Sequence, residues 1–532
     1  MGIFISLQVT IECVVAALLF SAALSATYVK LLGILQSSGY SGKRLFLWAG
    51  KKNNAAIPRL TLLSMLCALS YAVIALCFSF AGVWAAVAAL SAYLLFLILY
   101  VVADKKMALR SPVSFTPRLK RLYVVSAFVT AVLVYFSITL LNFADYLWQN
   151  HVFNLLRYLP LAIFPLLSLP IIALANLIAK IYEVPHNKSF IRAAKKKMGA
   201  SKLTVVGITG SYGKTSTKQI LSGILSKKYR VLSTPRSHNT PLGLALSINS
   251  NDLENYDIFI AEMGARHLGD IAELCEFCPP DYSVITGICP QHLESFKTEE
   301  NIIKAKGEIL LSTKQKAIIA PDAYDSFCSY DCRKVSADCV SNIVCKSSGT
   351  EFALTLGGQT KIVKTKLLGE HSAHNVAIAA CLAFELGMSL DEIASAVAEL
   401  DFIEHRLQLI QSGGVNILDD GYNSNVKGAA AAIQVLGTFE GRKIVVTPGL
   451  VELGILEESE NYALGKKLVG LDEVILVGDT LVTPVRKGFL ENGGDSKKLH
   501  TVPTLFAAQD MLKGILQSGD TVLFLNDLPD IY

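Results

Sequence analysis

The stretch Leu203-Thr-Val-Val-Gly-Ile-Thr-Gly-Ser-Tyr-Gly-Lys-Thr-Ser-Thr217 decides the fold of the second part of this 532-residue chain. Its first six residues predict a strand, and the residues from Lys214 onward predict a helix. A glycine-rich turn between a strand and a helix can wrap around phosphate groups, because its backbone comes close to them and the helix N-terminus supplies N–H donors. The spacing G-x-x-G-K-T departs from the general P-loop pattern by one residue, since position 208 is Ile.

We therefore predict a nucleotide site in which Lys214 reaches the β- and γ-phosphates and the Thr215 hydroxyl binds Mg²⁺. The alternative interpretation is an ordinary glycine-rich turn. The residues expected around the phosphates are Thr209, Gly210, Ser211, Tyr212, Gly213, Lys214, Thr215 and Ser216.

Three further residues are candidates for a metal site next to this turn. The apolar run 258–261 predicts a strand, and Glu262 at its end is a suitable Mg²⁺ ligand at the carboxyl edge of a sheet. A carboxylate that is only solvated at a strand end is the alternative. His292 and Lys306 follow, but residue type alone gives neither a role, because a lone histidine is more often structural than a ligand.

Short β-rich runs alternate with helical stretches from about residue 201 to the C-terminus, which is typical of parallel α/β domains. Residues 352–365 alternate in polarity and predict a small antiparallel insert, and a second α/β block begins after about residue 402. The strands expected are 203–208, 258–261, 283–285, 317–319, 443–446, 473–477 and 521–525, and the helices are 214–226, 373–386, 390–400 and 426–436.

The first 185 residues have a different character. The chain is 52% hydrophobic and only 17% charged, and its net charge of +5 gives no basic footprint of a nucleic-acid-binding protein, so we expect no nucleic-acid partner. Residues 60–103 contain no charged residue and no histidine, and this length suffices for two membrane spans with a turn near Ala81 and Gly82. Three more spans are expected at 13–29, extending past Lys30, at 122–144 and at 158–179, the last interrupted by Pro160, Pro165 and Pro170.

A cleaved signal peptide followed by buried helices is the alternative, but it explains one segment rather than five. The loops that follow spans one, three and five carry clusters of Lys and Arg, whereas the N-terminal segment, the turn near Gly82 and residues 142–156 carry neither. The positive-inside rule then predicts a multi-pass protein of the cell membrane with everything after Lys180 in the cytoplasm.

The second part of the chain resembles the Mur ligases, a family of ATP-dependent amide ligases of peptidoglycan precursor assembly, and it is most similar to the branch that adds D-alanyl-D-alanine. The resemblance implies a P-loop central domain at 200–402 and a Rossmann-like C-terminal domain at 403–532, behind an α-helical membrane bundle at 1–185. The matching stretches are 207–216, 261–264, 269–272, 280–286, 292–294, 305–308, 369–375, 405–406, 419–425 and 452–454.

The resemblance also implies roles for individual residues. Thr215 and Glu262 would hold one Mg²⁺, His292 would help to hold a second, and Lys306 would be carbamylated by CO₂ into an anionic ligand. With Lys214 these form the expected catalytic set. Asn375 would contact the adenine, Arg406 and Asp420 would hold the nucleotide, and Thr234 and Asn239 would lie on the substrate side of the cleft.

The activity that the resemblance implies is transfer of the ATP γ-phosphoryl group to a substrate carboxylate, followed by attack of an amine on the acyl phosphate. The expected partners are a UDP-muramoyl tripeptide, or another peptide, and an amino acid or dipeptide amine. In this chain the apolar region stands where the family has an N-terminal domain that binds the uridine nucleotide. This difference puts the nucleotide-sugar substrate in question.

Two alternatives therefore stay open. One is a related membrane-anchored ligase that works on poly-γ-glutamate or on a lipid-linked precursor, with membrane lipid as a partner. The other is a membrane transport or regulatory protein whose ligase-like part only binds ATP. The eleven cysteines are scattered, and Cys275 and Cys278 are expected in the core rather than at a metal.

Overall fold

The computed structural model describes residues 2–50, 54–77, 83–105, 113–148, 156–235, 238–290, 293–422, 425–451, 453–478 and 481–526. Contacts divide the described residues into two compact units, one that runs to residue 186 and one that begins at residue 187. This boundary lies one residue from the expected end of the apolar region. We call the two parts the helical unit and the α/β unit.

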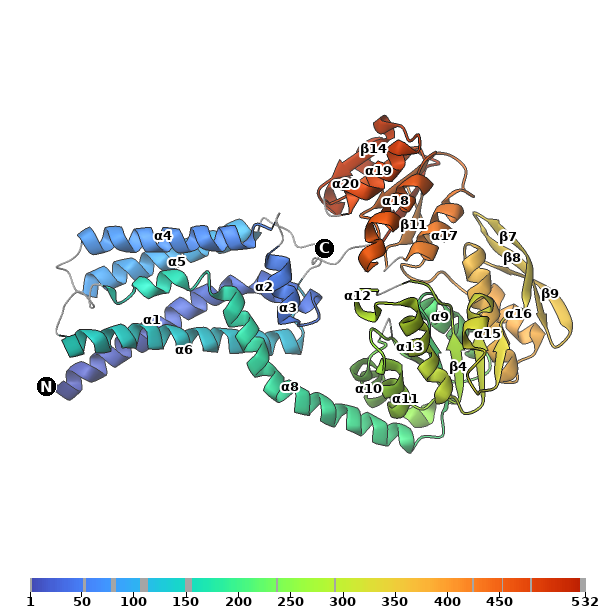
Figure 1. Ribbon diagram of the computed structural model, residues 1–532, viewed down its shortest axis with the longest axis horizontal. Coiled ribbons are helices and arrows are strands. Elements are labelled where there is room, and N and C mark those ends of the chain that lie inside the picture. Colours follow the sequence, from blue (N-terminus) through green and yellow to red (C-terminus); the bar gives the residue numbers. More distant parts are fainter. Residues whose placement is uncertain are drawn as a thin grey trace. The chain divides into compact units, whose positions relative to one another are not determined.

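The helical unit is a bundle of long apolar helices (Figure 1). Helices α1 and α6 lie side by side, as do α4 and α5, and Phe20 of α1 contacts Tyr93 of α5 edge to face with 6.0 Å between the ring centroids. The elements are α1 Gly2–Ala26, α2 Tyr28–Ser37, α3 Gly42–Ala49, α4 Ala56–Cys77, α5 Val83–Lys105, α6 Pro117–Trp148, η1 Leu159–Ile163 and α8 Ser168–Gly199.

Within the described residues, four helices are long and apolar enough to cross a membrane, and the count reaches five if α1 and α2, bent by 52° at Thr27, form one span. These candidates match the five expected segments, although the expected turn near Ala81 and Gly82 lies outside the described residues. The last segment was predicted to begin at residue 158. Its long helix begins instead at Ser168, after a 3₁₀ turn, because Pro160 and Pro165 precede it and Pro170 falls in its first turn, where proline needs no N–H partner.

The central block of the α/β unit is a six-stranded, wholly parallel sheet with the strand order β2-β3-β1-β4-β5-β6. Strand β1 lies in its middle, and its partner β3 pairs Ile208 with Glu262. The carboxyl ends of β1 and β3 therefore lie next to each other. The strands are β1 Thr204–Thr209, β2 Val231–Ser233, β3 Ile258–Glu262, β4 Tyr282–Ile285, β5 Lys316–Ile319 and β6 Lys334–Ser336.

Helices cover both faces of this sheet, and the expected antiparallel insert is present as three strands. The inserted strands are β7 Val340–Lys346, β8 Gly349–Leu356 and β9 Gln359–Thr365. The helical elements are α9 Lys214–Leu225, α10 Pro241–Asn249, η2 Leu253–Asn255, α11 Asp270–Phe277, α12 Leu293–Phe296, α13 Glu299–Leu311, α14 Pro321–Tyr324, η3 Asp325–Phe327, α15 Glu370–Glu385 and α16 Leu390–Ala398.

The C-terminal block is a second six-stranded sheet with the order β10-β11-β15-β12-β13-β14, in which only the β10–β11 pair is antiparallel. The strands are β10 Gln408–Ser412, β11 Val415–Asp420, β12 Lys443–Thr447, β13 Glu473–Val477, β14 Leu499–Val502 and β15 Thr521–Leu525. The helical elements are α17 Val426–Leu436, η4 Gly454–Leu456, α18 Glu457–Lys467, α19 Val482–Glu491, η5 Ser496–Lys498 and α20 Leu505–Ile515. The α/β architecture and the named strands and helices are confirmed, with ends that shift by a few residues.

The two cysteines that were predicted to lie in the core of the α/β unit do lie there. Cys275 and Cys278 are buried, and the Cys275 Sγ lies 3.9 Å from the Met263 sulfur. Burial raises the pKa of the Cys275 thiol to about 12, which keeps it protonated.

Candidate active site

The turn between β1 and α9 has a backbone that only glycine allows at two positions. Gly210 has φ +148° and Gly213 has φ +77°, and a Cβ atom on Gly210 would collide with the Thr286 Oγ1. The end of β4 holds the turn in place, since the Ser211 N–H donates to the Gly287 carbonyl at 2.8 Å. The result is a loop that lies directly before the first turn of α9, as the sequence predicts.

Lys214 is the first residue of α9 and folds back over this loop. Its Nζ donates to the Gly210 carbonyl at 2.6 Å and to the Ser211 carbonyl at 3.4 Å. Burial lowers the pKa of Lys214, and the Arg406 charge lowers it further, whereas Glu262 opposes the shift. The Lys214 cation thus lies at the position where phosphate oxygens would replace carbonyl oxygens as its partners.

Glu262 ends β3 and is the centre of a polar cluster. The Thr215 Oγ1 donates to its Oε2 at 3.1 Å, and the Asn239 Nδ2 donates to its Oε1 at 3.2 Å. Lys218 forms an ion pair with the same carboxylate at 3.0 Å, and both side chains are almost completely buried. The Thr234 Oγ1 accepts the Glu262 backbone N–H at 3.2 Å, so that Thr234 positions this strand end.

The donor set around Glu262 fits a magnesium ion. Mg²⁺ prefers oxygen ligands and usually takes one or two from protein side chains and the rest from phosphate and water. Thr215 and Glu262 supply a hydroxyl and a carboxylate within 3.1 Å of each other. No group of three or more His, Cys, Asp or Glu side chains that could hold a metal alone occurs within the described residues.

Lys306 lies on α13 and is buried. Its Nζ is 5.8 Å from the centroid of the Phe296 ring. Burial, and next the charge of Lys214, lower the pKa of Lys306 to about 7. A large fraction of this amine is therefore neutral at physiological pH, and the neutral amine is the form that can react with CO₂.

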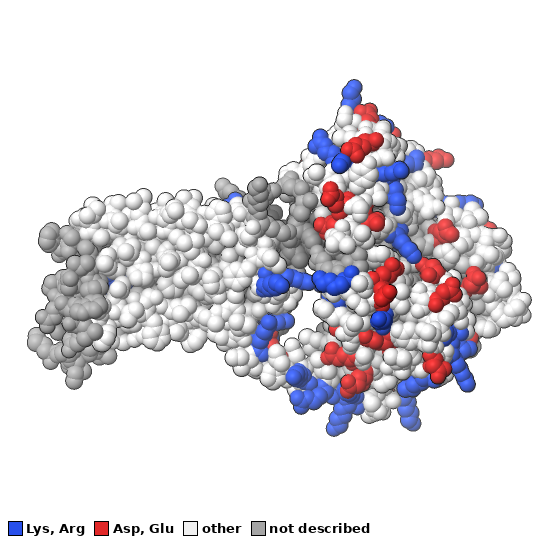
Figure 2. All heavy atoms as spheres, in the orientation of Figure 1, with Lys and Arg blue, Asp and Glu red and all other residues white. Residues whose placement is uncertain are grey.

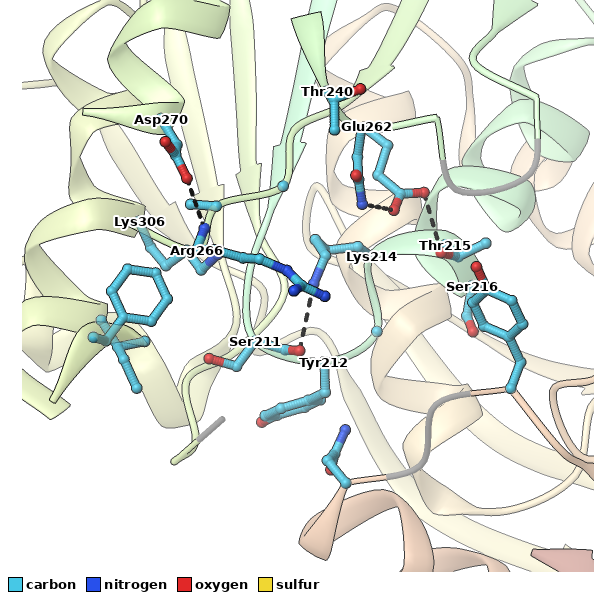
Figure 3. Close-up of a pocket in the computed structure, with 18 of the residues that line it drawn as sticks. Ser211, Tyr212, Lys214, Thr215, Ser216, Thr240, Glu262, Arg266, Asp270 and Lys306 are labelled. Atoms are coloured by element: carbon cyan, nitrogen blue, oxygen red, sulfur yellow. Dashed lines mark hydrogen bonds between the residues drawn. The ribbon is translucent and has the colours of Figure 1, made fainter. Parts of the chain in front are cut away.

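A cavity of about 420 Å³ connects these groups (Figure 3). Ten lining residues were not among the predicted site residues, and they include Arg266, His267 and Asp270 after β3, and Tyr422 and Asn425 of the C-terminal block. Arg266 could have been found, since it stands two residues after the motif 261–264. The predicted residues that line the cavity are Ser211, Tyr212, Gly213, Lys214, Thr215, Ser216, Asn239, Glu262, Lys306 and Arg406.

Six other predicted residues, including Thr234 described above, lie outside the lining or outside the description. Thr209 ends β1 and Gly210 begins the loop, and the Asn375 Oδ1 accepts the Thr217 hydroxyl of α9 at 3.2 Å. Asp420 accepts the Leu407 N–H at 3.3 Å, and burial raises its pKa to about 7 despite the opposing Arg406 charge. His292 lies outside the described residues.

Contacts connect the C-terminal block to the loop. The Lys427 Nζ donates to the Asp322 carboxylate at 2.8 Å, and the Tyr212 hydroxyl of the loop donates to the same Asp322 oxygen. The Arg406 Nη1 donates to the Tyr422 carbonyl at 2.8 Å. Residues of both α/β blocks thus line one cavity, as a nucleotide held between two domains requires.

Comparison with known proteins gives two family models along this unit. Residues 208–383 match the Mur ligase middle domain, and residues 405–526 match the Mur ligase, glutamate ligase domain. The chain is 32% identical to the UDP-N-acetylmuramoyl-tripeptide–D-alanyl-D-alanine ligase of Escherichia coli over 333 residues, which cover 59% of this chain and 74% of that protein. It is 28% identical to the ligase of the same name from Bacillus subtilis, over 60% of this chain and 72% of that protein.

Solved structures agree with these matches. The MurF ligase of Thermotoga maritima, in complex with ADP, superimposes with a TM-score of 0.58 at 30% identity and covers 65% of this chain and 81% of its own. The MurF of Acinetobacter baumannii gives a TM-score of 0.59 at 25% identity, over 65% of this chain and 78% of its own.

Proposed function

This chain belongs to the Mur ligase family, and from that premise we propose that it uses ATP to join D-alanyl-D-alanine to the terminal carboxylate of a UDP-muramoyl tripeptide in peptidoglycan precursor synthesis. The observation that carries the proposal is one cavity lined by Lys214, Thr215, Glu262 and Lys306. These residue types are the ones that phosphoryl transfer to a carboxylate needs: cations for the phosphates and oxygen ligands for a metal.

The mechanism follows from what these side chains can do. ATP would lie with its phosphates along the 209–216 loop, where the N–H groups at the start of α9 and the Lys214 ammonium offset their charge. Arg406 and Asp420, and Asn375 on α15, would hold the rest of the nucleotide. Magnesium held by Thr215 and Glu262 would withdraw charge from the β- and γ-phosphate oxygens.

The reaction then has two steps. A carboxylate oxygen of the donor forms a bond to the γ-phosphorus while the bond to the ADP oxygen breaks. The neutral amine of D-alanyl-D-alanine next attacks the acyl carbon and loses a proton to solvent, and phosphate leaves with the oxygen that had belonged to the carboxylate. Because Tyr212 and Lys427 connect the loop to the C-terminal block, closure of that block would exclude water from the acyl phosphate.

Lys306 acts in this proposal as a carbamate, with His292 as a further ligand at the metal site. The buried neutral amine attacks CO₂ and loses a proton, which converts a potential cation beside the metal into an anion. The lowered pKa of Lys306 supports this role, since an ordinary lysine would be almost fully protonated and unreactive.

We assign the helical unit to the cell membrane as a multi-pass anchor at 1–185, with the central domain at 200–402 and the C-terminal domain at 403–532 in the cytoplasm. Large apolar side chains point away from the bundle, and Leu76 is 82% exposed. The described part of this unit that is visible in Figure 2 is largely free of charge, whereas Lys, Arg, Asp and Glu are spread over the visible face of the α/β unit. ATP is available in the cytoplasm, which agrees with the orientation that the basic loops predict.

The apolar unit also favours a second candidate, a donor whose carboxylate belongs to a lipid-linked precursor. Full-length protein in detergent, with ATP and Mg²⁺, would be tested for phosphate release with UDP-muramoyl tripeptide plus D-alanyl-D-alanine, with lipid-linked muramoyl tripeptide plus the same dipeptide, and with glutamate substrates. We expect the first pair to give the highest kcat/KM. A preference for the lipid-linked donor would select the second candidate, and activity only with glutamate would contradict both.

A further inference from the structure

The loop that follows β3 forms part of the wall of the cavity and is held in place by hydrogen bonds. The Asp270 carboxylate accepts the backbone N–H groups of Arg266 and His267 at 2.8 and 2.9 Å. The Glu308 carboxylate accepts those of Gly269 and Ala272 at 2.7 and 2.9 Å. Glu308 is on α13, two residues after Lys306, so that this helix and the loop form one rigid wall.

Arg266 is the residue of this wall that reaches across the cavity. Its side chain is exposed and extends toward Lys214, whereas its backbone is held by Asp270 (Figure 3). The phosphate loop and α9 supply the groups proposed to bind the triphosphate, and Arg266 belongs to neither. Arg266 thus brings a positive charge to the cavity from outside the phosphate loop.

Charge and shape indicate what this group binds. A carboxylate that approaches a triphosphate is repelled, and a cation between the two anions offsets that repulsion. The planar guanidinium also pairs with both oxygens of a carboxylate at once, which a lysine ammonium cannot do.

We propose that Arg266 binds the donor carboxylate and directs one of its oxygens at the γ-phosphorus. This assignment rests on the proposed function, because it names the residue that positions the donor of that reaction. When the oxygen–phosphorus bond forms and ADP leaves, the guanidinium keeps its contact with the other carboxyl oxygen. No proton moves in this step, so the residue acts by binding and orientation.

The test compares three variants of the full chain in detergent with UDP-muramoyl tripeptide, D-alanyl-D-alanine and Mg-ATP. Arg266→Gln should raise the KM for the tripeptide about 10- to 100-fold, the range for a lost charge-assisted hydrogen bond pair, with the KM for ATP within about twofold. Arg266→Lys should recover part of the loss, because it keeps the charge without the planar fork. Lys304→Gln removes one positive charge from an exposed position of α13 outside the cavity lining and should change neither constant.

Each outcome decides the assignment. A rise in the tripeptide KM alone supports it. Equal KM values in Arg266→Gln and Lys304→Gln would overturn it and leave the proposed function intact. A parallel rise in the KM for ATP would indicate that Arg266 binds the γ-phosphate, and it would overturn the carboxylate assignment. An inactive wild-type protein would contradict the proposed function, and the assignment of this donor would fall with it.

Discussion

The helical unit and the α/β unit place their charged and apolar side chains in opposite ways. In the helical unit, Leu69 points outward with 64% of its side chain exposed, and Lys30 pairs with Asp104 at 3.3 Å. In the α/β unit, Lys218, Glu262 and Lys306 are buried beside one cavity. The first arrangement is stable when an apolar medium surrounds it, and the second when an anion and a metal enter it.

The largest effect is expected for Lys214→Ala. The variant loses the cation that folds over the phosphate loop, so we expect ATP turnover to fall about 100- to 1,000-fold, as for other groups that stabilise transition-state charge. Phosphate release in detergent measures this. Lys227→Ala, at an exposed lysine paired with Glu399, is the matched control. Full activity of Lys214→Ala would show that ATP turnover does not depend on the Lys214 charge.

The outward apolar surface is tested by Leu69→Asp in the middle of α4. A carboxylate at the centre of a span costs about 2.5–3.5 kcal/mol of insertion free energy, so the fraction of protein that resists carbonate extraction should fall. Phe506→Asp, at a 73% exposed position of the α/β unit, should leave the fraction unchanged. If the Leu69→Asp protein is as active and as firmly membrane-bound as wild type, then α4 does not contact lipid at this position.

Lys306→Ala tests the carbamate. We expect amide formation to fall about 10- to 100-fold, the range seen when groups that support a metal site are removed, and added bicarbonate or chloride to restore part of it. The rate of D-alanyl-D-alanine incorporation measures both effects. The control is Lys304→Ala on the outer side of α13. Unaltered activity of Lys306→Ala would exclude the carbamate.

The smallest effect concerns His371 at the start of α15. Burial lowers its pKa to about 4, so between about pH 4 and 6.5 the unfolded state binds more protons than the folded state, and stability rises with pH across that window and is constant above it. His371→Gln should flatten the melting-temperature profile there by the equivalent of at most about 3 kcal/mol, because each pH unit between the two pKa values corresponds to about 1.4 kcal/mol. The exposed His374→Gln, one turn later, should retain the slope. Identical slopes of melting temperature against pH in the two variants would show that a group other than His371 titrates in this window.

Local patterns in the sequence predict the parts of the site that depend on one strand and its turn. The phosphate loop and Glu262 are of this kind, because the glycines and the strand end are neighbours in the sequence or in sheet register. Lys218 and Arg266 were missed, because only packing brings α9 against β3 and tethers the 266–270 loop to α13. Lys306 had no role by residue type, since its burial depends on how α13 packs. Helix α8 begins later than predicted because of three prolines. The hydropathy pattern does not show where these prolines allow the helix to begin.

The most direct test follows one oxygen atom through the reaction. UDP-muramoyl tripeptide carrying ¹⁸O in its terminal carboxylate is incubated with the full chain, Mg-ATP and D-alanyl-D-alanine, and the released phosphate is analysed by mass spectrometry. If the cavity forms an acyl phosphate, one ¹⁸O atom moves into phosphate for each amide bond made. Amide formation with unlabelled phosphate would contradict the account.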